Sequence, residues 1–456
     1  MARKSASHGL GIYGTIWTGQ TISNLGTGLG SFSLGVWLYQ QTQSVTQFSG
    51  MMLAATLTAL VLTPVAGSVA DRVDRRRVLI LCNLGSAVMT LLMVAALYTG
   101  RMQPWYAYIV AVVMTGLAIV QGPAFVASVS VLVPRHLLVR TSSLSQTAAA
   151  ITGIAAPFLA GILIGRIGVH GVIFLDFCTF LIAALSVLIV RIPRPPASGI
   201  GTQPFWHDAL LGWRYIRERP GLLSLLFLFG SATFSVGIVQ ALLTPLILSF
   251  ATPQELGTVS SAGPAGLLLG GLILTLWGGP KQRVWGIFGA LVAQALILFL
   301  GGLEPNVPLV TAAVFAFMLT TPFIGSGSQA IWQSKVALDL QGRVFAIRGL
   351  IASASLPLAY AVAGPLADRV FEPMLAPGGA LAGTVGRFIG VGDGRGVGFL
   401  FMVLGAFLLA LTLVSFLNPR LRNVETELPD ATRPEEEQGA GPAEEAPRPE
   451  PSAARG

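Results

Sequence analysis

Long stretches without charged side chains constrain this sequence more than any other feature. Twelve apolar runs follow one another along the chain, each near the ~20 residues that cross a bilayer as a helix. Eleven contain no Asp, Glu, Lys or Arg, and the sixth contains Asp176 alone. Because hydrocarbon offers no hydrogen-bond partners, such runs must be helices rather than open sheets. The predicted spans are 11–39, 47–70, 78–100, 105–133, 141–165, 171–190, 221–250, 257–279, 284–303, 306–334, 349–366 and 397–417.

The composition agrees with a membrane protein. Charged residues make up 11% of the chain, against about 25% in a soluble globular protein. The net charge of +8 comes from basic residues in short segments between the spans, so we expect no nucleic-acid partner. Cys82 and Cys178 both lie inside apolar runs, and their spacing predicts neither a disulfide nor a metal site.

The distribution of basic residues sets the orientation. With the N-terminus in the cytoplasm, twenty Lys and Arg residues fall on the cytoplasmic side and five on the outside. Cytoplasmic loops of membrane proteins carry such an excess. We therefore predict a multi-pass protein of the cytoplasmic (inner) membrane with both termini in the cytoplasm.

The chain is expected to divide into two halves of six spans. Pro157 in the fifth span and Pro357 in the eleventh lie 200 residues apart, in the similar stretches AAPFLAG and SLPLAYA. Parallel repeats of this kind occur in transporters. The predicted fold is an all-α membrane protein of twelve transmembrane helices in two pseudo-symmetric bundles. The predicted boundaries are 1–190 for the first bundle, 191–220 for a cytoplasmic linker, 221–417 for the second bundle and 418–456 for a disordered cytoplasmic tail.

Two features of the polar segments refine these boundaries. In the linker, Trp206, Ala209, Leu210 and Trp213 fall on one face at helical spacing, which favours an amphipathic helix on the membrane surface over a plain loop. From about residue 423 the chain is rich in Pro, Glu and Ala with few apolar side chains, which is typical of disorder.

One short loop gathers the charge that the spans lack. The stretch GSVADRVDRRR between the second and third spans resembles the signature loop of the major facilitator superfamily, although Asp74 stands where that loop usually has glycine. Twelve spans in two halves match the same superfamily. The phrases GQTISNLGTGLGSFSLGVWLYQQT, GVIFLDFCTF and GPLADRVFEP resemble its macrolide- and siderophore-efflux branch, which includes the enterobactin exporter. The gating residues implied by the loop are Gly67, Asp71, Arg72, Arg75, Arg76 and Arg77.

The resemblance implies how this loop works. Asp71 would accept hydrogen bonds from the N-terminus of the eleventh helix, and the arginines would pair with carboxylates or lipid phosphates, so that the inner gate is held shut. The alternative is that the arginines only anchor topology. Many antiporters of the superfamily carry a Gly-Pro pair in the fifth span, where this chain has Ala156 before Pro157. The residues expected to kink or closely pack the helices are Gly153, Pro157, Gly161 and Pro357.

Polar side chains within the spans are few and mostly neutral. Each alone is more often a helix–helix hydrogen bond than a ligand contact, but together they describe a mostly apolar cavity that suits bulky amphipathic compounds. The candidate cavity residues are Gln20, Asn24, Gln121, Gln146, Gln240 and Gln329.

The energy source is the least specified feature. The chain has no phosphate-binding loop, no catalytic constellation and no metal-ligand cluster, so we expect neither an enzyme nor a cofactor. Asp176 is the one carboxylate within a span and is the candidate proton carrier, because intramembrane carboxylates are costly. Its alternative is a structural cap near the outer end of the sixth span.

These observations predict a secondary transporter that works by alternating access. The expected activity is export of a drug-like or siderophore-like small molecule in exchange for protons, by a monomer in the lipid bilayer. One alternative is an importer or a facilitator without proton coupling. The other is a non-transporting membrane scaffold or sensor that acts through its acidic tail.

Overall fold

A computed structural model describes residues 2–190, 213–338 and 340–427, and the side chains of residues 2–8 and 67–72 lie outside the described part. The described residues are almost entirely helical and contain no β-strand. The predicted all-α class is therefore confirmed. Trp206, Ala209 and Leu210 of the expected linker helix lie outside the described residues.

The first half of the chain folds into one helical bundle. Its fifth helix, 52 residues long, is interrupted at Gly168, whose φ of 70° and ψ of 171° favour glycine. This break divides the helix into two arms, which correspond to the fifth and sixth predicted spans. The helices are α1 (Ala2–Thr42), α2 (Val45–Arg72), α3 (Arg75–Tyr98), α4 (Pro104–Leu132) and α5 (Leu138–Ile189).

The second half forms a matching bundle. Proline opens α7 and α8 at the first helical position, where a missing N–H costs nothing. The N-terminus of α8 also has a capping box, in which Thr252 and Glu255 satisfy each other's backbone N–H groups. The long helices are α7 (Pro220–Leu248), α8 (Pro253–Trp277), α9 (Arg283–Gly301), α10 (Val307–Lys335), α11 (Gln341–Leu366) and α14 (Arg395–Leu417).

The number of spans follows from these helices. Within the described residues, ten helical segments are long and apolar enough to cross a membrane, and one of them, Arg135–Ile189, is 55 residues long. Counting the two arms of α5 separately and adding α1, the described part contains twelve long helices. This agrees with the prediction.

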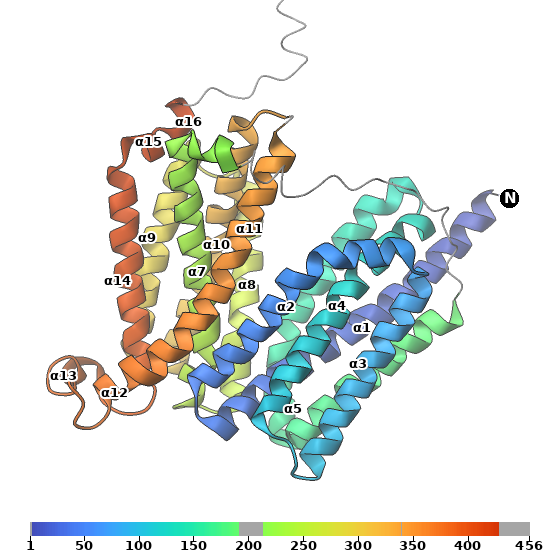
Figure 1. Cartoon of the computed structure of the whole chain (residues 1–456), viewed down its shortest axis with the longest axis horizontal. Coiled ribbons are helices and arrows are strands. Elements are labelled where there is room, and N and C mark those ends of the chain that lie inside the picture. The colour runs from blue at the N-terminus through green and yellow to red at the C-terminus, as the bar shows by residue number, and fades with distance from the viewer. Residues whose placement is uncertain (1, 191–212, 339, 428–456) are drawn as a thin grey trace, which may run out of the picture.

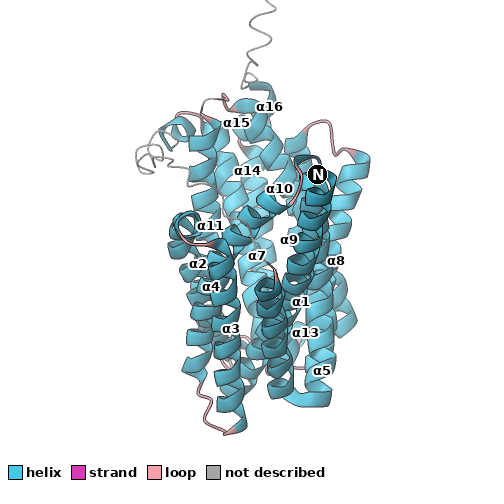
Figure 2. Ribbon diagram, turned by 90° about the vertical axis from the view of Figure 1, so that its right-hand side faces the viewer, coloured by secondary structure: helices cyan, strands magenta, loops and turns pink. Residues whose placement is uncertain are grey.

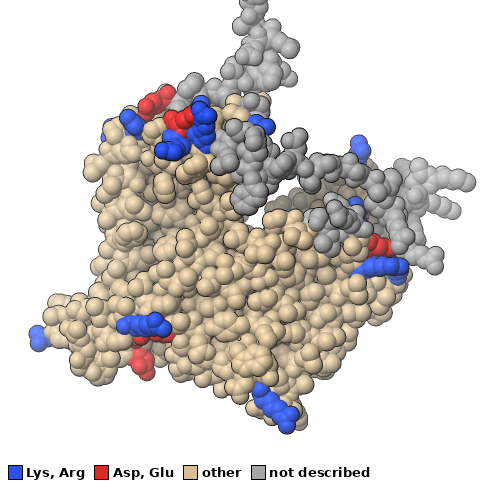
Figure 3. Space-filling model, in the orientation of Figure 1, with Lys and Arg blue, Asp and Glu red and all other residues tan. Residues whose placement is uncertain are grey.

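The two bundles meet at one end. Figure 1 shows the first half tilted against the second, so that they lie together at the lower face and diverge at the upper face. The upper face carries the α2–α3 turn, and the lower face carries the α1–α2 turn. The main contacts between the halves join α2 to α11 and α5 to α8. The space-filling surface is notched between the halves at the upper face (Figure 3).

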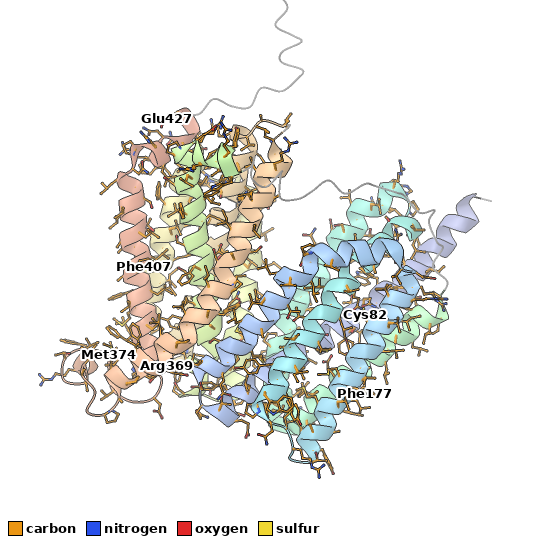
Figure 4. All side chains as sticks on the ribbon, in the orientation of Figure 1. Cys82, Phe177, Arg369, Met374, Phe407 and Glu427 are labelled. Carbon is orange, nitrogen blue, oxygen red and sulfur yellow. The ribbon has the colours of Figure 1, made fainter. Side chains whose placement is uncertain are left out.

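The outer surface is suited to lipid. Leu276, Phe407 and Leu417 are well exposed, and Figure 4 places Phe407 on the outer side of α14. Figure 2, turned by 90°, shows the helices of both halves running in a common direction. Most charged side chains visible in Figure 3 lie toward the two faces rather than along this surface.

Short helices complete the two faces. At the lower face, the π-helical turn η2 (Ala367–Phe371) continues α11 and leads to α12 (Glu372–Leu375) and α13 (Gly386–Ile389). At the upper face, α15 (Pro419–Arg422) and α16 (Val424–Glu427) pack against the second half.

The start of the expected tail differs from the prediction. Leu421 and Val424 are completely buried, and the Glu425 carboxylate accepts a 3.0 Å hydrogen bond from the backbone N–H of Val284 at the start of α9. Residues 418–427 are therefore part of the second half, because two apolar side chains and one cap attach them. Residues 428–456 lie outside the described part.

Candidate functional site

A cavity in the first half brings three of the predicted residues together. It has a volume of about 170 Å³ and is formed by α1, α4 and α5. Gln20 and Asn24 come from α1, and Gln121 comes from α4. None of its lining residues is ionisable. They are Trp17, Gln20, Thr21, Asn24, Ala118, Gln121, Gly122, Phe125, Ser145, Ala148, Ala149 and Thr152.

Amide hydrogen bonds connect three helices at this cavity. Gln121 Nε2 donates to Gln20 Oε1 over 2.7 Å and to Asn83 Oδ1 over 3.2 Å. Asn83, on α3, is fully buried and donates in turn to the carbonyl of Leu79 over 2.8 Å. Sequence reasoning missed Asn83, although an amide inside an otherwise apolar span was a visible signal.

Gln20 retains an unused donor. Its side chain is only 7% exposed, and its Nε2 is buried without a hydrogen-bond partner among the described residues. A buried donor left unsatisfied costs about 1–3 kcal/mol. Rotation of the Gln20 amide toward the cavity would let this donor bond to an acceptor oxygen of a bound molecule and relieve that cost. Trp17, whose indole N–H donates to Ser145 Oγ over 3.2 Å, and Phe125 add apolar surface.

The other three candidate amides lie elsewhere. Gln146 is exposed on α5 and does not line the cavity. Gln240, on α7, accepts a 2.7 Å hydrogen bond from the Tyr360 hydroxyl, and Gln329, on α10, accepts one from Arg348. The predicted set of six is therefore not one cluster, because these amides occupy different helix–helix contacts in different halves.

Arg348 is a buried cation, although the predicted eleventh span, 349–366, begins one residue after it. Because α11 begins at Gln341 rather than at residue 349, this arginine lies inside the helix and is 8% exposed. It donates to Gln329 and, over 3.3 Å, to Ser328. Its guanidinium also lies 5.7 Å from the ring centre of Trp332, within cation–π range. The apolar residues just before it were the available signal that the helix starts early.

Asp176 occupies a second cavity, of about 180 Å³, with no lining residue in common with the first. The carboxylate lies on the second arm of α5, is 2% exposed and packs against Gly26 and Gly30 of α1. Its side chain accepts a hydrogen bond from the Thr179 hydroxyl over 3.5 Å. Four methionines surround this cavity, Met51, Met52, Met93 and Met114.

The charged loop makes contacts other than the expected ones. Asp74 caps α3 by accepting the N–H of Arg76 over 3.0 Å. Arg75 donates to the carbonyl of Ala127 over 2.7 Å, and Arg76 donates to that of Leu188 over 2.8 Å. Both partners are backbone carbonyls of the same half rather than carboxylates, and Arg77 is exposed. The side chains of Gly67, Asp71 and Arg72 lie outside the described residues.

Glycines determine how closely α5 approaches α8. A methyl group on Gly161 would lie 2.8 Å from the carbonyl oxygen of Pro253, and one on Gly257 would lie 2.5 Å from that of Pro157. Gly153 faces Pro264 with more room, at 3.5 Å. The predicted packing stretch thus lies at the contact between the halves. Pro357 is buried within α11.

Comparison with known proteins gives the family. The Major Facilitator Superfamily model matches residues 16–360. Macrolide efflux protein A of Streptococcus pyogenes is 27% identical over 364 residues, which cover 78% of this chain and 89% of that protein. Multidrug efflux pump Tap of Mycolicibacterium fortuitum is 26% identical over 345 residues, covering 73% of this chain and 83% of its own.

Solved structures show the same fold at low identity. The nucleoside transporter NupG matches with a TM-score of 0.67 at 13% identity, over 89% of this chain and 99% of its own. A bacterial homologue of the lysosomal transporter Spinster matches with a TM-score of 0.66 at 13% identity, over 93% and 98%. From its helices and from the family match, the chain belongs to the major facilitator superfamily and is a multi-pass membrane transporter rather than an enzyme.

Proposed function

We propose that this transporter exports a bulky, amphipathic, drug-like or siderophore-like molecule in exchange for protons. The observation that carries the proposal is the uncharged cavity of α1, α4 and α5, in which aromatic surface adjoins amides and Gln20 keeps a free donor. Such a site suits a neutral or weakly charged molecule with an apolar body and acceptor oxygens. The relatives named as macrolide and multidrug efflux proteins support this class of cargo.

Transport proceeds by alternating access of the two halves. Residues 1–190 and 221–417 act as the moving bodies, and residues 191–220 link them. The excess of basic residues supports a cytoplasmic upper face, with both termini in the cytoplasm. The open upper face then corresponds to an inward-facing state. The transporter acts as a monomer in the inner membrane. Asp71 would close the upper face by capping α11, which begins at Gln341.

Asp176 is the proposed proton carrier. A carboxylate that is 2% exposed inside a membrane bundle is expensive to charge, and it lines a cavity that admits small groups. Proton binding from one side and release to the other would couple the pH gradient to the rocking of the halves. The competing role is a structural cap between α1 and α5. In that case, replacing Asp176 would impair folding, but the folded protein would still couple transport to protons.

The cavity is tested by transport in inverted membrane vesicles. Vesicles containing the protein should accumulate a radiolabelled macrolide when their interior is acidified, and a protonophore should abolish the accumulation. Gln20→Ala should raise KM about fivefold, the scale of one lost hydrogen bond, with little change in kcat. Gln146→Ala is the matched control, because its side chain is exposed outside the cavity. Equal kinetics for both variants would exclude the cavity as the binding site.

The same vesicles separate export from the alternatives. Accumulation that is insensitive to the protonophore and reaches only equilibrium would indicate a facilitator. Accumulation that survives the deletion of residues 428–456 would exclude a scaffold that acts only through its tail, and an inserted full-length protein that accumulates no macrolide would favour one.

A further inference from the structure

One seven-residue pattern occurs twice, at opposite ends of a contacting helix pair. Residues 67–73 read GSVADRV at the end of α2, and residues 364–370 read GPLADRV at the end of α11. The two helices contact each other across the two halves. Because α2 ends at the upper face and α11 ends at the lower face, the second pattern lies beside the start of α2. The first pattern is separated from the start of α11 by the opening between the halves (Figure 1).

At the lower face, the second pattern joins the halves. The Asp368 carboxylate accepts the backbone N–H groups of Val45 over 3.0 Å and of Thr46 over 2.9 Å. It also accepts the hydroxyl of Ser44 over 2.7 Å. The first N–H groups of a helix have no partner within the helix, and the helix dipole favours an anion there. A carboxylate from the second half therefore caps the start of α2 in the first half.

The backbone around Asp368 is shaped for this contact. A methyl group on Gly364 would lie 2.5 Å from the Cα of Thr46 and would also collide with the Ser49 hydroxyl, so only glycine permits the approach. The π-helical turn η2 begins at Ala367 and includes Asp368. Single π-turns of this kind are frequent at functional sites, because they redirect the side chains they carry.

We propose that Asp368 is a positioning residue for transport, which latches the lower face shut while the upper face is open. The latch opens when the halves rock, because separating the lower ends of α2 and α11 breaks all three hydrogen bonds together. When the upper face is closed, Asp71 makes the reciprocal contact with the start of α11. This part of the proposal rests on the proposed function. The two carboxylates then alternate, each engaged in the state in which the other is free.

Glu372 provides a control for an ordinary structural cap. It lies four residues after Asp368 and accepts the backbone N–H of Val397 over 3.0 Å, near the start of α14. Both helices of that contact belong to the second half, so its loss should weaken the fold without favouring either state. Figure 4 labels two neighbouring residues beyond the lower end of α11, Arg369 in η2 and Met374 in α12.

The latch is tested by the distance between the halves. Spin labels at Gln43→Cys and Arg387→Cys, both exposed positions at the lower face, report closure by electron paramagnetic resonance in nanodiscs. Cys82 and Cys178 are first replaced by alanine. Asp368→Ala should lower the ratio of closed to open lower faces about tenfold, a difference of about 1.4 kcal/mol. Asp368→Asn, which keeps one acceptor oxygen, should shift it less.

Two further variants sharpen the result. Gly364→Ala should open the lower face as Asp368→Ala does, whereas Gly349→Ala, with no atom near its added methyl group, should not. Glu372→Gln should lower the melting temperature and leave the ratio of closed to open lower faces within about twofold. An unchanged distance distribution in a folded Asp368→Ala variant would overturn the latch.

The reciprocal role of Asp71 has its own outcome. Asp71→Asn should shift the equilibrium toward a closed lower face, and the double variant with Asp368→Asn should return toward the starting ratio. A double variant that matches Asp368→Asn alone would overturn the reciprocity. These distances need neither cargo nor a pH gradient, so they remain informative if the proposed substrate or coupling is wrong.

Discussion

The two halves share one architecture but bury different chemistry. In the first half, neutral amides line a cavity, and the buried charge is the carboxylate of Asp176. In the second half, the buried charges are the cations of Lys335, Arg348 and Arg395. Among them, Arg348 is held by Gln329, Ser328 and aromatic rings. The two halves thus repeat one arrangement of helices but differ in the charges that they bury.

The acid and the cation should have separable roles. Within the described residues, Arg348 contacts neutral oxygens and aromatic rings, and Asp176 packs against glycines of α1. A buried charge held without an opposite charge is costly and usually functional in a membrane. We assign Asp176 to coupling and expect Arg348 to organise the second half.

Removing the acid should give the largest effect. Asp176→Asn keeps the shape of the side chain but cannot carry a proton, so pH-driven macrolide accumulation should fall about tenfold or more, equivalent to about 1.4 kcal/mol. Exchange of labelled for unlabelled macrolide, without a pH gradient, should continue. Both rates can be measured in the same vesicles. If the pH-driven accumulation of the asparagine variant equals that of the wild type, Asp176 is a structural residue.

Removing the cation should have an intermediate effect on stability. Arg348→Met keeps most of the volume but leaves the oxygens of Gln329 and Ser328 without their donor, at a cost of about 1–3 kcal/mol. Thermal melting in detergent measures the change. Arg348→Lys should recover part of the stability, since it keeps the charge but loses the planar fork of donors. A melting temperature that does not change in Arg348→Met would show that the cation is dispensable for the fold.

The smallest effect is expected at the amide network of the first half. Asn83→Ala removes one acceptor for Gln121, whose bond to Gln20 remains, so the loss should be about 1 kcal/mol. The readouts are the melting temperature and the KM for the macrolide. Thr147→Ala is a suitable control, because this exposed hydroxyl bonds only locally, to the carbonyl of Ser143. If Asn83→Ala lost more stability than Arg348→Met, the amide network would matter more to the fold than the cation does.

The long helices were predictable because hydrocarbon imposes the same demand on every span. A run without charge has one structural solution in a membrane, which explains the agreement in number and approximate limits. The early start of α11 was not predictable from charge alone, since Arg348 is accommodated by rings and side-chain oxygens from α7 and α10. Its burial depends on neighbours distant in the sequence.

The candidate site was predictable only in part. Lipid and protein interior are both apolar, so the sequence pattern of a span does not tell which polar residue faces a cavity. Gln20, Asn24 and Gln121 came together, whereas Gln240 and Gln329 bond to Tyr360 and Arg348. The contact of Asp368 with Ser44 joins residues 324 apart in the chain, and only the packing of the halves reveals it.

The attachment of α16 has a practical consequence. Glu425 is held by the start of α9 and by Lys335, whose ammonium group donates to its backbone carbonyl. A fluorescent protein fused directly after Glu427 would therefore move together with the second bundle. Paired with a dye on the α2–α3 turn, such a fusion would report the proposed rocking of the bundles as a change in energy transfer that can be followed in living cells.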